Sequence, residues 1–162
     1  KVPIQYGKLV IRAKAYAQPG IWPALWLRPF SDKDLQVKGE IDMLEYIDAW
    51  KDSLVQVNYH LWGDFRGQKN NHVQYPQWAK VKVSDWHVYQ VELLKKKMII
   101  KIDDIEVYRI KKGEKGSEWP FDVNWQLLLS QAYGGWGATG GIDDNKLPAE
   151  FLIDYVKYYP LK

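Results

Sequence analysis

Strict two-residue alternation in residues 53–62 constrains the fold more than any other feature of this chain. Apolar side chains point one way and polar or aromatic side chains point the other way, which is the period of a half-buried β-strand. No window of the sequence holds helical periodicity over more than two turns. The pattern therefore predicts a strand with one face in a core and one face open. The first face carries Val55, Val57, Tyr59 and Leu61, and the second carries Gln56, Asn58, His60 and Trp62.

More strands of this kind, separated by turn signals, are predicted along the whole sequence. Turns are expected at Pro19-Gly20, at Lys95-Lys96-Lys97 and at Asp103-Asp104. Strands at this spacing predict an all-β fold, an antiparallel β-sandwich or jelly roll, in a single domain over residues 1–162. The other predicted strands cover residues 8–16, 21–27, the segment around 40–45, 86–92, 98–102, 105–110, 126–133 and 150–159, with loops at 29–38, 63–77 and 134–141.

Composition limits the kinds of partner that the domain can have. The chain holds nine Trp and eleven Tyr, more than a small core needs, and aromatic rings stack on the apolar face of sugar rings. The net charge of +3 is spread between basic and acidic stretches, so we expect no nucleic-acid partner. Apolar runs stay far below the roughly 20 residues of a membrane span, so we expect no membrane partner. The absence of cysteine excludes disulfides and thiolate chemistry.

Three carboxylates lie close together in Gly39-Glu40-Ile41-Asp42-Met43-Leu44-Glu45-Tyr46. Glu40 and Asp42 share one face of a strand, and Glu45 should point the other way. One extra residue, a β-bulge around Met43-Leu44, would return Glu45 to the same face. Ionised carboxylates on one face repel each other, whereas retaining glycoside hydrolysis needs two carboxyl groups about 5–5.5 Å apart. The spacing predicts catalysis, and a charged edge strand that guards against aggregation is the alternative.

Six segments, in sequence order, resemble those of glycoside hydrolase family 16. They are Tyr6-Gly7-Lys8, Gly20-Ile21-Trp22-Pro23-Ala24-Leu25-Trp26-Leu27, the carboxylate motif, Asp85-Trp86-His87-Val88-Tyr89, Trp119-Pro120-Phe121-Asp122 and Ile153-Asp154-Tyr155-Val156. The family contains laminarinases, mixed-linkage β-glucanases, agarases, porphyranases and κ-carrageenases. The E-x-D-x-x-E spacing resembles the bulged subgroup, which holds laminarinases and several marine-polysaccharide enzymes. Lichenases and xyloglucan transglycosylases typically lack the bulge.

The resemblance implies a jelly roll of two curved sheets with the substrate across the concave face. It implies that Glu40 is the nucleophile, Asp42 the assisting carboxylate and Glu45 the general acid/base. The implied activity is that of a retaining endo-β-glycanase on laminarin or mixed-linkage β-1,3/1,4-glucan, with no required cofactor. It also implies a secreted, periplasmic or cell-surface location. A galactan hydrolase of the agarase, porphyranase or carrageenase type, a transglycosylase and a non-catalytic glycan-binding jelly roll remain open alternatives.

Two departures from the family pattern bear on the cleft. The family domain is usually longer, and its additional part precedes Tyr6-Gly7 and supplies strands to both sheets. A sandwich without those strands exposes open edges and apolar faces, so we expect self-association, a complementing chain, or an inactive fragment that needs the additional strands. Many relatives also carry Asn near the position of Ser130, within residues 128–132. A contact near the cleft is therefore expected to differ here.

Several further residues are candidates for substrate binding. Trp22 and Trp26 share a strand face with Arg28, and the resemblance places this face in the cleft; a place in the core is the alternative for the two rings. The resemblance also places the face of Asn58, His60 and Trp62 beside the carboxylates, where a histidine could contact Asp42 or a sugar hydroxyl. The remaining two candidates are Gln131 and, in a glycine-rich loop that can approach a ligand closely, Trp136.

One residue is a candidate metal ligand. Asp154 matches an aspartate that binds calcium on the convex face of many family members. Calcium takes six to eight oxygen ligands, and some of the family's ligands lie in the part that precedes Tyr6. The resemblance therefore implies a structural calcium ion at Asp154, and a role at the end of a strand is the alternative.

Overall fold

Two antiparallel β-sheets packed face to face make up the protein. The computed structural model describes residues 2–16, 18–31, 35–50, 53–114 and 118–161. One sheet has the strand order β11-β1-β7-β8-β9, and the other has the order β10-β2-β3-β4-β5, with β6 also paired to β4. The strands are β1 (Gly7–Ala15), β2 (Ile21–Pro29), β3 (Val37–Glu45), β4 (Leu54–Phe65), β5 (Gln68–Gln74), β6 (Gln77–Lys80), β7 (His87–Leu94), β8 (Lys97–Ile102), β9 (Ile105–Lys111), β10 (Trp125–Tyr133) and β11 (Phe151–Pro160).

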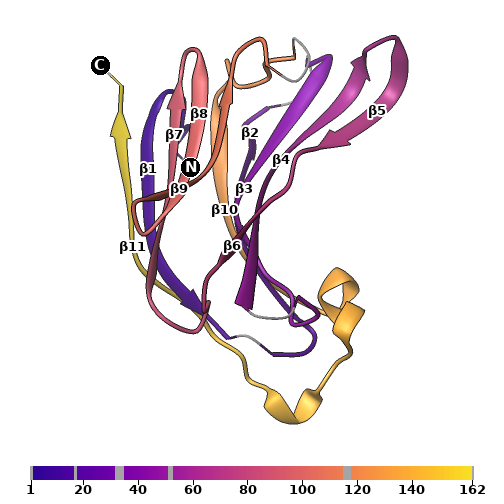
Figure 1. Cartoon of the computed structure of the whole chain (residues 1–162), viewed down its shortest axis with the longest axis vertical. Coiled ribbons are helices and arrows are strands. Elements are labelled where there is room, and N and C mark those ends of the chain that lie inside the picture. The colour runs from indigo at the N-terminus through magenta and orange to yellow at the C-terminus, as the bar shows by residue number, and fades with distance from the viewer. Residues whose placement is uncertain (1, 17, 32–34, 51–52, 115–117, 162) are drawn as a thin grey trace.

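The predicted all-β sandwich of jelly-roll type is confirmed. Figure 1 shows the β1-β7-β8-β9-β11 sheet as one layer and the sheet that contains β3 and β4 as the second layer. Between them lies one hydrophobic core that includes Ile11, Leu25, Ile41, Tyr59 and Tyr89. Each of these side chains is at most 1% exposed, so the inward faces of both sheets are sealed from water.

Strand β4 shows how the alternating sequence produces a two-faced sheet. The apolar set from Val55 to Leu61 faces the core and is at most 1% exposed. The alternate set from Gln56 to Trp62 points to the other face, as predicted. The opposite sheet packs on only one face of β4, so the second face is free to line a binding surface.

The expectation of a loop over residues 63–77 is wrong. Strand β4 continues to Phe65, turns at Arg66-Gly67 and returns as β5, which pairs with β4 from His60–Gln74 to Phe65–Gln68. Both turn residues have positive φ, 53° and 73°, as a two-residue type I′ hairpin turn requires. The composition of β5 is polar because most of its side chains are exposed at the end of the sheet. Pairing with β4 overrides the weak strand propensity of these residues.

Two sheet edges lie next to each other on one side of the sandwich. β10 and β11 each end their sheet, and a cavity of about 520 Å³ lies between them, lined mainly by apolar side chains. Leu129 on β10 and Val156 on β11 are both 44% exposed. Between these strands the chain forms two short 3₁₀ helices, η2 (Gly135–Gly140) and η3 (Asp144–Lys146). None of the helical segments in the described ranges has the length and apolar character to cross a bilayer.

Candidate active site

A β-bulge at Met43 brings the three carboxylates to one face of β3, as predicted. In the pairing with β4, Asp42 lies opposite Asn58 and Glu45 lies opposite Gln56, so three residues advance on one strand while two advance on the other. In the pairing with β2 the register also shifts, between Leu44 and Asp42. Met43 and Leu44 are both buried in the core. Their apolar side chains therefore favour the bulged register that returns Glu45 to the side of Glu40.

The three carboxylates line a single pocket on the face of the sheet opposite the core. The pocket has a volume of about 270 Å³. Oxygen atoms of Glu40 and Asp42 and a ring nitrogen of His60 all lie within 4.8 Å of one another. Two buried polar atoms in the pocket, Nε1 of Trp22 and Oδ2 of Asp42, have no hydrogen-bond partner of good geometry in the described chain. The pocket is lined by Trp22, Ala24, Trp26, Glu40, Asp42, Glu45, Ser130 and Ala132.

Burial raises the pKa of all three carboxyl groups. Loss of solvation raises the pKa of Glu40 to about 7 and that of Glu45 to about 8, and it also raises the pKa of Asp42 above its usual range. The negative charge of Asp42 adds to the shift of both glutamates. His60 lowers both of these pKa values, and Arg28 lowers only that of Glu40. The guanidinium of Arg28 therefore favours the ionised form of Glu40.

His60 links the carboxylates to the neighbouring strands. Its Nε2 lies 3.0 Å from Oδ2 of Asp42, and its Nδ1 lies 3.0 Å from Nε2 of His72 on β5. Asn58 lies below, with Nδ2 3.0 Å from Nε2 of His60, and its Oδ1 accepts a hydrogen bond from the backbone N–H of Tyr75. Burial lowers the pKa of His60. The charges of Glu40 and Glu45 oppose this shift, and the contact with Asp42 holds the imidazole beside the carboxylates.

Comparison with known proteins agrees with this geometry. The sequence profile of the glycosyl hydrolases family 16 matches residues 1–157. The chain belongs to glycosyl hydrolase family 16. It is 30% identical, over 95% of its own length and 57% of the relative's, to a β-glucanase of Rhodothermus marinus. It is also 30% identical, over 99% of its length and 38% of the relative's, to a keratan-sulfate endo-1,4-β-galactosidase of Sphingobacterium multivorum.

Solved structures give the same result. The laminarinase from Rhodothermus marinus superimposes with a TM-score of 0.83 at 28% identity, covering 99% of this chain and 67% of that chain. The chain spans between about a third and three fifths of the length of the two curated relatives above. The matched region contains the carboxylate strand, both sheets and the glycine-rich segment at η2.

The two tryptophans of β2 lie in the carboxylate pocket, as predicted. Trp22 and Trp26 are half-buried and line the pocket beside the carboxylates. The indole N–H of Trp26 donates a 3.0 Å hydrogen bond to Oγ of Ser130 on β10. A serine at this position therefore fixes one ring of the cleft. Arg28 continues the same face of β2 and is exposed, and its charge lowers the pKa of Glu40.

Two of the predicted substrate contacts need correction. Gln131 lies between Ser130 and Ala132, which line the pocket, so strand alternation turns it away from the cleft. Its side-chain amide donates instead to the carbonyl of Ala149 at 3.0 Å. Asn58 is 0% exposed and cannot reach a substrate. It lies under His60, so the structure gives it a positioning contact rather than a binding surface.

Trp62 packs beside His60 on β4, and Trp136 packs beside Trp22 of the pocket. Trp62 is nearly parallel to the imidazoles of His60 and His72, at 5.0 and 4.8 Å between ring centroids. Trp136, on η2, is 40% exposed and packs edge-on against Trp22 at 5.0 Å. No local pattern singles out His72, because its contact with His60 depends on the pairing of β5 with β4.

The calcium ligand stays a prediction. Asp154 lies on β11, and its Oδ2 accepts a 2.5 Å hydrogen bond from Arg12. Within the described ranges, the one group of three or more acidic or histidine side chains with metal-binding spacing is that of Glu40, Asp42 and His60. The arginine already neutralises Asp154, so these residues alone do not fit a calcium site.

His87 lies away from the carboxylate pocket, with its Nδ1 beside Oδ2 of Asp103.

Proposed function

We propose that this chain is the catalytic domain of a retaining endo-β-glycanase that hydrolyses β-1,3-glucan or mixed-linkage β-1,3/1,4-glucan. The observation that carries this proposal is the bulge at Met43, which puts Glu40 and Glu45 in one pocket with Asp42. A retaining mechanism requires two carboxyl groups on facing sides of the bond that breaks. The relatives named β-glucanase and laminarinase support a glucan as the substrate.

The family motif and the shared pocket support the roles of the two glutamates. Glu40, beside Arg28 and His60, is the nucleophile that attacks the anomeric carbon. Glu45 keeps its proton longer and donates it to the oxygen of the leaving sugar. In the second step Glu45 accepts a proton from water, and the water oxygen displaces the enzyme carboxylate from the sugar. The configuration at the anomeric carbon is therefore retained.

His60 and Asp42 position the reacting groups in this mechanism. Asp42 lies between the two glutamates, and its negative charge raises both of their pKa values. His60 is close to Asp42 and moderates that effect. Nε1 of Trp22 and Oδ2 of Asp42 are polar atoms at the wall of the pocket, and they are suited to bind the hydroxyl groups of a sugar there.

Incubation with a panel of polysaccharides tests the proposal. The purified domain is incubated with laminarin, mixed-linkage β-glucan, agar and carrageenan, and reducing ends are counted. We expect release from the two glucans, and proton NMR of the first product should show the β-anomer. Glu40→Gln is expected to be inert. A protein that releases no reducing ends from any of these glycans, although it is folded, contradicts the proposal.

A galactan hydrolase is the second candidate function, because one relative is named an endo-1,4-β-galactosidase. Release of reducing ends from galactans alone would favour it. A labelled laminari-oligosaccharide acceptor separates hydrolysis from transglycosylation, since the transferase makes longer labelled products. A non-catalytic glycan-binding domain would bind laminarin and leave it intact.

We also infer that the open edges at β10 and β11 are covered in the native protein, by self-association or by another polypeptide segment. The support is the exposed apolar groove between these two edges. Sedimentation at increasing protein concentration tests self-association. A strictly monomeric species contradicts self-association, and full activity of that species without any added polypeptide contradicts a need for cover by another segment. Secretion to the periplasm, the cell surface or the medium is proposed with the glucan substrate, and cell fractionation tests it.

A further inference from the structure

A continuous row of four tryptophans begins in the pocket and ends on β6. Trp22 packs against Trp136 at 5.0 Å, Trp136 against Trp50 at 5.1 Å, and Trp50 against Trp78 at 4.7 Å between ring centroids. All three contacts are edge-to-face, with angles of 82°, 74° and 86° between the ring planes. The four rings come from β2, η2, the segment after β3 and β6. The row therefore exists only in the folded chain.

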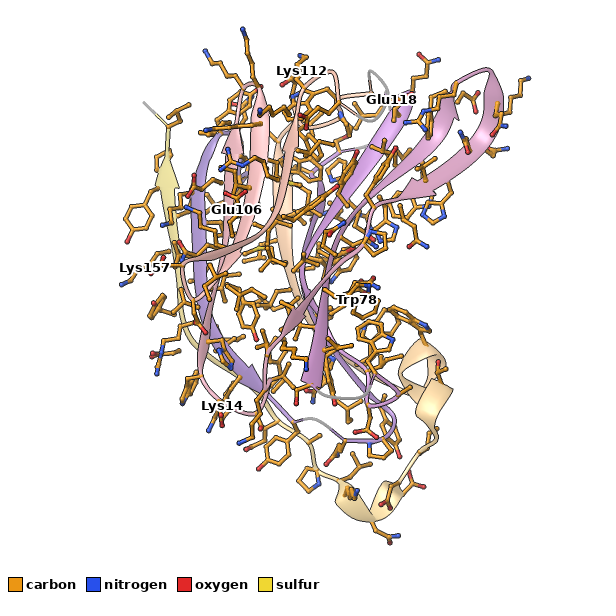
Figure 2. All side chains as sticks on the ribbon, in the orientation of Figure 1. Lys14, Trp78, Glu106, Lys112, Glu118 and Lys157 are labelled. Carbon is orange, nitrogen blue, oxygen red and sulfur yellow. The ribbon has the colours of Figure 1, made fainter. Side chains whose placement is uncertain are left out.

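The strand register places Trp78 on the same face of the sheet as the carboxylates. Glu45 on β3 lies opposite Gln56 on β4, and Gln56 lies opposite Trp78 on β6. Residues that are directly opposite in a sheet point to the same face. Trp78 is therefore two strands from Glu45, about 10 Å, since neighbouring strands lie about 4.8 Å apart. Figure 2 shows Trp78 on the side of β6 that faces η2.

Exposure separates the rings that can bind from the ring that supports them. Trp78 is 45% exposed and Trp136 is 40% exposed, whereas Trp50, between them, is half-buried. Trp50 lies edge-to-face with both neighbours and so holds the two exposed rings one ring apart. Aromatic pairs of this geometry add about 0.5–1.5 kcal/mol beyond the burial of their area, so the arrangement is favourable without a ligand.

The backbone fixes the row through two close glycine contacts. A Cβ atom on Gly137 would lie 2.9 Å from Cβ of Trp22, and one on Gly140 would lie 3.1 Å from the backbone nitrogen of Ala49. These contacts bring η2 against β2 at one end and against the segment of Trp50 at the other. The loop that holds Trp136 is therefore docked against both neighbouring rings.

We propose that Trp78 is a sugar-binding platform for the leaving portion of the glucan chain, and that Trp50 positions Trp78 and Trp136. This inference rests on the proposed glycanase function. The row begins at Trp22 in the pocket, and its far end, Trp78, lies in register with the acid/base Glu45 across β4. The acid/base contacts the oxygen of the leaving sugar. A chain that leaves the pocket along the row meets exposed indole rings, on which the apolar faces of pyranose rings stack.

Trp78→Ala is compared with Trp86→Ala on laminari-oligosaccharides that carry a label at the reducing end. Trp86 is a matched control, because it is 37% exposed but packs against Arg12 and Lys14 of the other sheet. Trp78→Ala should raise KM for long oligosaccharides up to about tenfold and leave kcat nearly unchanged. It should also move the cleaved bond toward the labelled end, because a shorter leaving portion then loses less binding. Trp78→Phe should retain most of the wild-type KM and cleavage position.

The role of Trp50 is tested in the same assay. Trp50→Ala should raise KM at least as much as Trp78→Ala does, and Trp50→Phe should keep KM near the wild-type value. The pH profile of kcat should stay unchanged in both Trp50 variants. If Trp78→Ala and Trp50→Ala match Trp86→Ala in KM and in cleavage position while the wild type cleaves laminarin, this inference fails and the proposed function stands. Failure of the wild type to cleave laminarin, together with failure of Glu40→Gln to bind it in a fluorescence titration, overturns both.

Discussion

The two sides of the carboxylate strand differ in the groups that surround two glutamates of identical chemistry. On the Glu40 side lie a guanidinium, Arg28, and the parallel rings of His60, Trp62 and His72. On the Glu45 side lie the edge-to-face tryptophans from Trp22 to Trp78. Both glutamates lose solvation, but His60 and the charge of Arg28 lower the pKa of Glu40, whereas His60 and a hydrogen bond from Trp22 lower that of Glu45, which the charge of Glu40 also raises. The neighbours, rather than the carboxyl groups themselves, decide which residue ionises first.

The most severe test of this difference replaces each glutamate in turn. Loss of a general acid/base lowers rates by about 10²–10⁴-fold, and we expect Glu45→Ala to fall in that range on laminarin. Glu40→Ala should be at least as impaired, since no covalent intermediate can form. With azide and an aryl β-glucoside that has an activated leaving group, both variants should recover activity. Glu40→Ala should then yield the α-glycosyl azide and Glu45→Ala the β-glycosyl azide.

The configuration of the azide product decides the assignment. In Glu40→Ala azide replaces the nucleophile, and in Glu45→Ala it attacks the glycosyl-enzyme. The two products therefore have opposite configuration. The α-azide from Glu45→Ala and the β-azide from Glu40→Ala would reverse the two roles. Asp42→Asn offers a control, because azide should not restore its activity in either configuration.

The pH profile of kcat/KM should be bell-shaped with its maximum between about pH 7 and pH 8. Activity requires ionised Glu40 and protonated Glu45. As the pH falls through about 7, Glu40 takes up a proton and attack is lost. As the pH rises through about 8, Glu45 loses its proton and the leaving oxygen is no longer protonated. An optimum below pH 5 would mean that the cleft does not raise these pKa values.

Replacement of His60 should disturb both sides, because His60 lowers the pKa of Glu40 and of Glu45. In His60→Asn both limbs of the pH profile should move to higher pH, and kcat should fall by about tenfold or more. His72→Asn should move the limbs less, since His72 touches the carboxylates only through His60. His87→Asn is the control, because His87 contacts Asp103 on the other sheet. Limbs that do not move in His60→Asn would separate His60 from the titration of the carboxyl groups.

Local sequence patterns were sufficient where a single strand decides the geometry. Alternation in residues 53–62 predicted both faces of β4, and the spacing of Glu40, Asp42 and Glu45 predicted the bulge at Met43. Family resemblance then supplied the roles. These features depend on residues close together in the chain and on side-chain period, which the sequence displays directly.

Features that depend on pairing between distant segments were missed. Strand β5 is polar and exposed, so it resembles a loop until β4 pairs with it, although Arg66-Gly67 is a two-residue turn signal. His72 was missed with it. Gln131 is predicted in the cleft, but its neighbours Ser130 and Ala132 hold the cleft face, and one residue along a strand moves a side chain to the opposite face. Trp50 and Trp78 meet only through η2 and β6, and no local pattern links them.

The smallest expected effect concerns stability, and it should again distinguish the two glutamates. Each has a folded-state pKa above its unfolded value of 4.5, so the folded protein binds more protons than the unfolded chain between pH 4.5 and the raised pKa. Stability must therefore fall as pH rises through that window. A glutamine binds no proton, so both variants should gain stability over the wild type as pH rises. Glu45→Gln should gain more, because its window extends to about pH 8 and that of Glu40 to about pH 7.

Thermal unfolding at pH 4.5 and pH 8.5 measures this gain. Partial exposure and relaxation reduce the effect, so we expect about 1–3 kcal/mol for Glu45→Gln at pH 8.5, at about 2–4 °C in Tm for each kcal/mol. Glu106→Gln is the control, because an ion pair with Arg109 lowers the pKa of Glu106 and its removal should not stabilise the protein at high pH. An equal gain from Glu40→Gln and Glu45→Gln would mean that the two sides of the cleft are electrostatically alike. The nucleophile and the acid would then have to be distinguished by the bound sugar rather than by the fold.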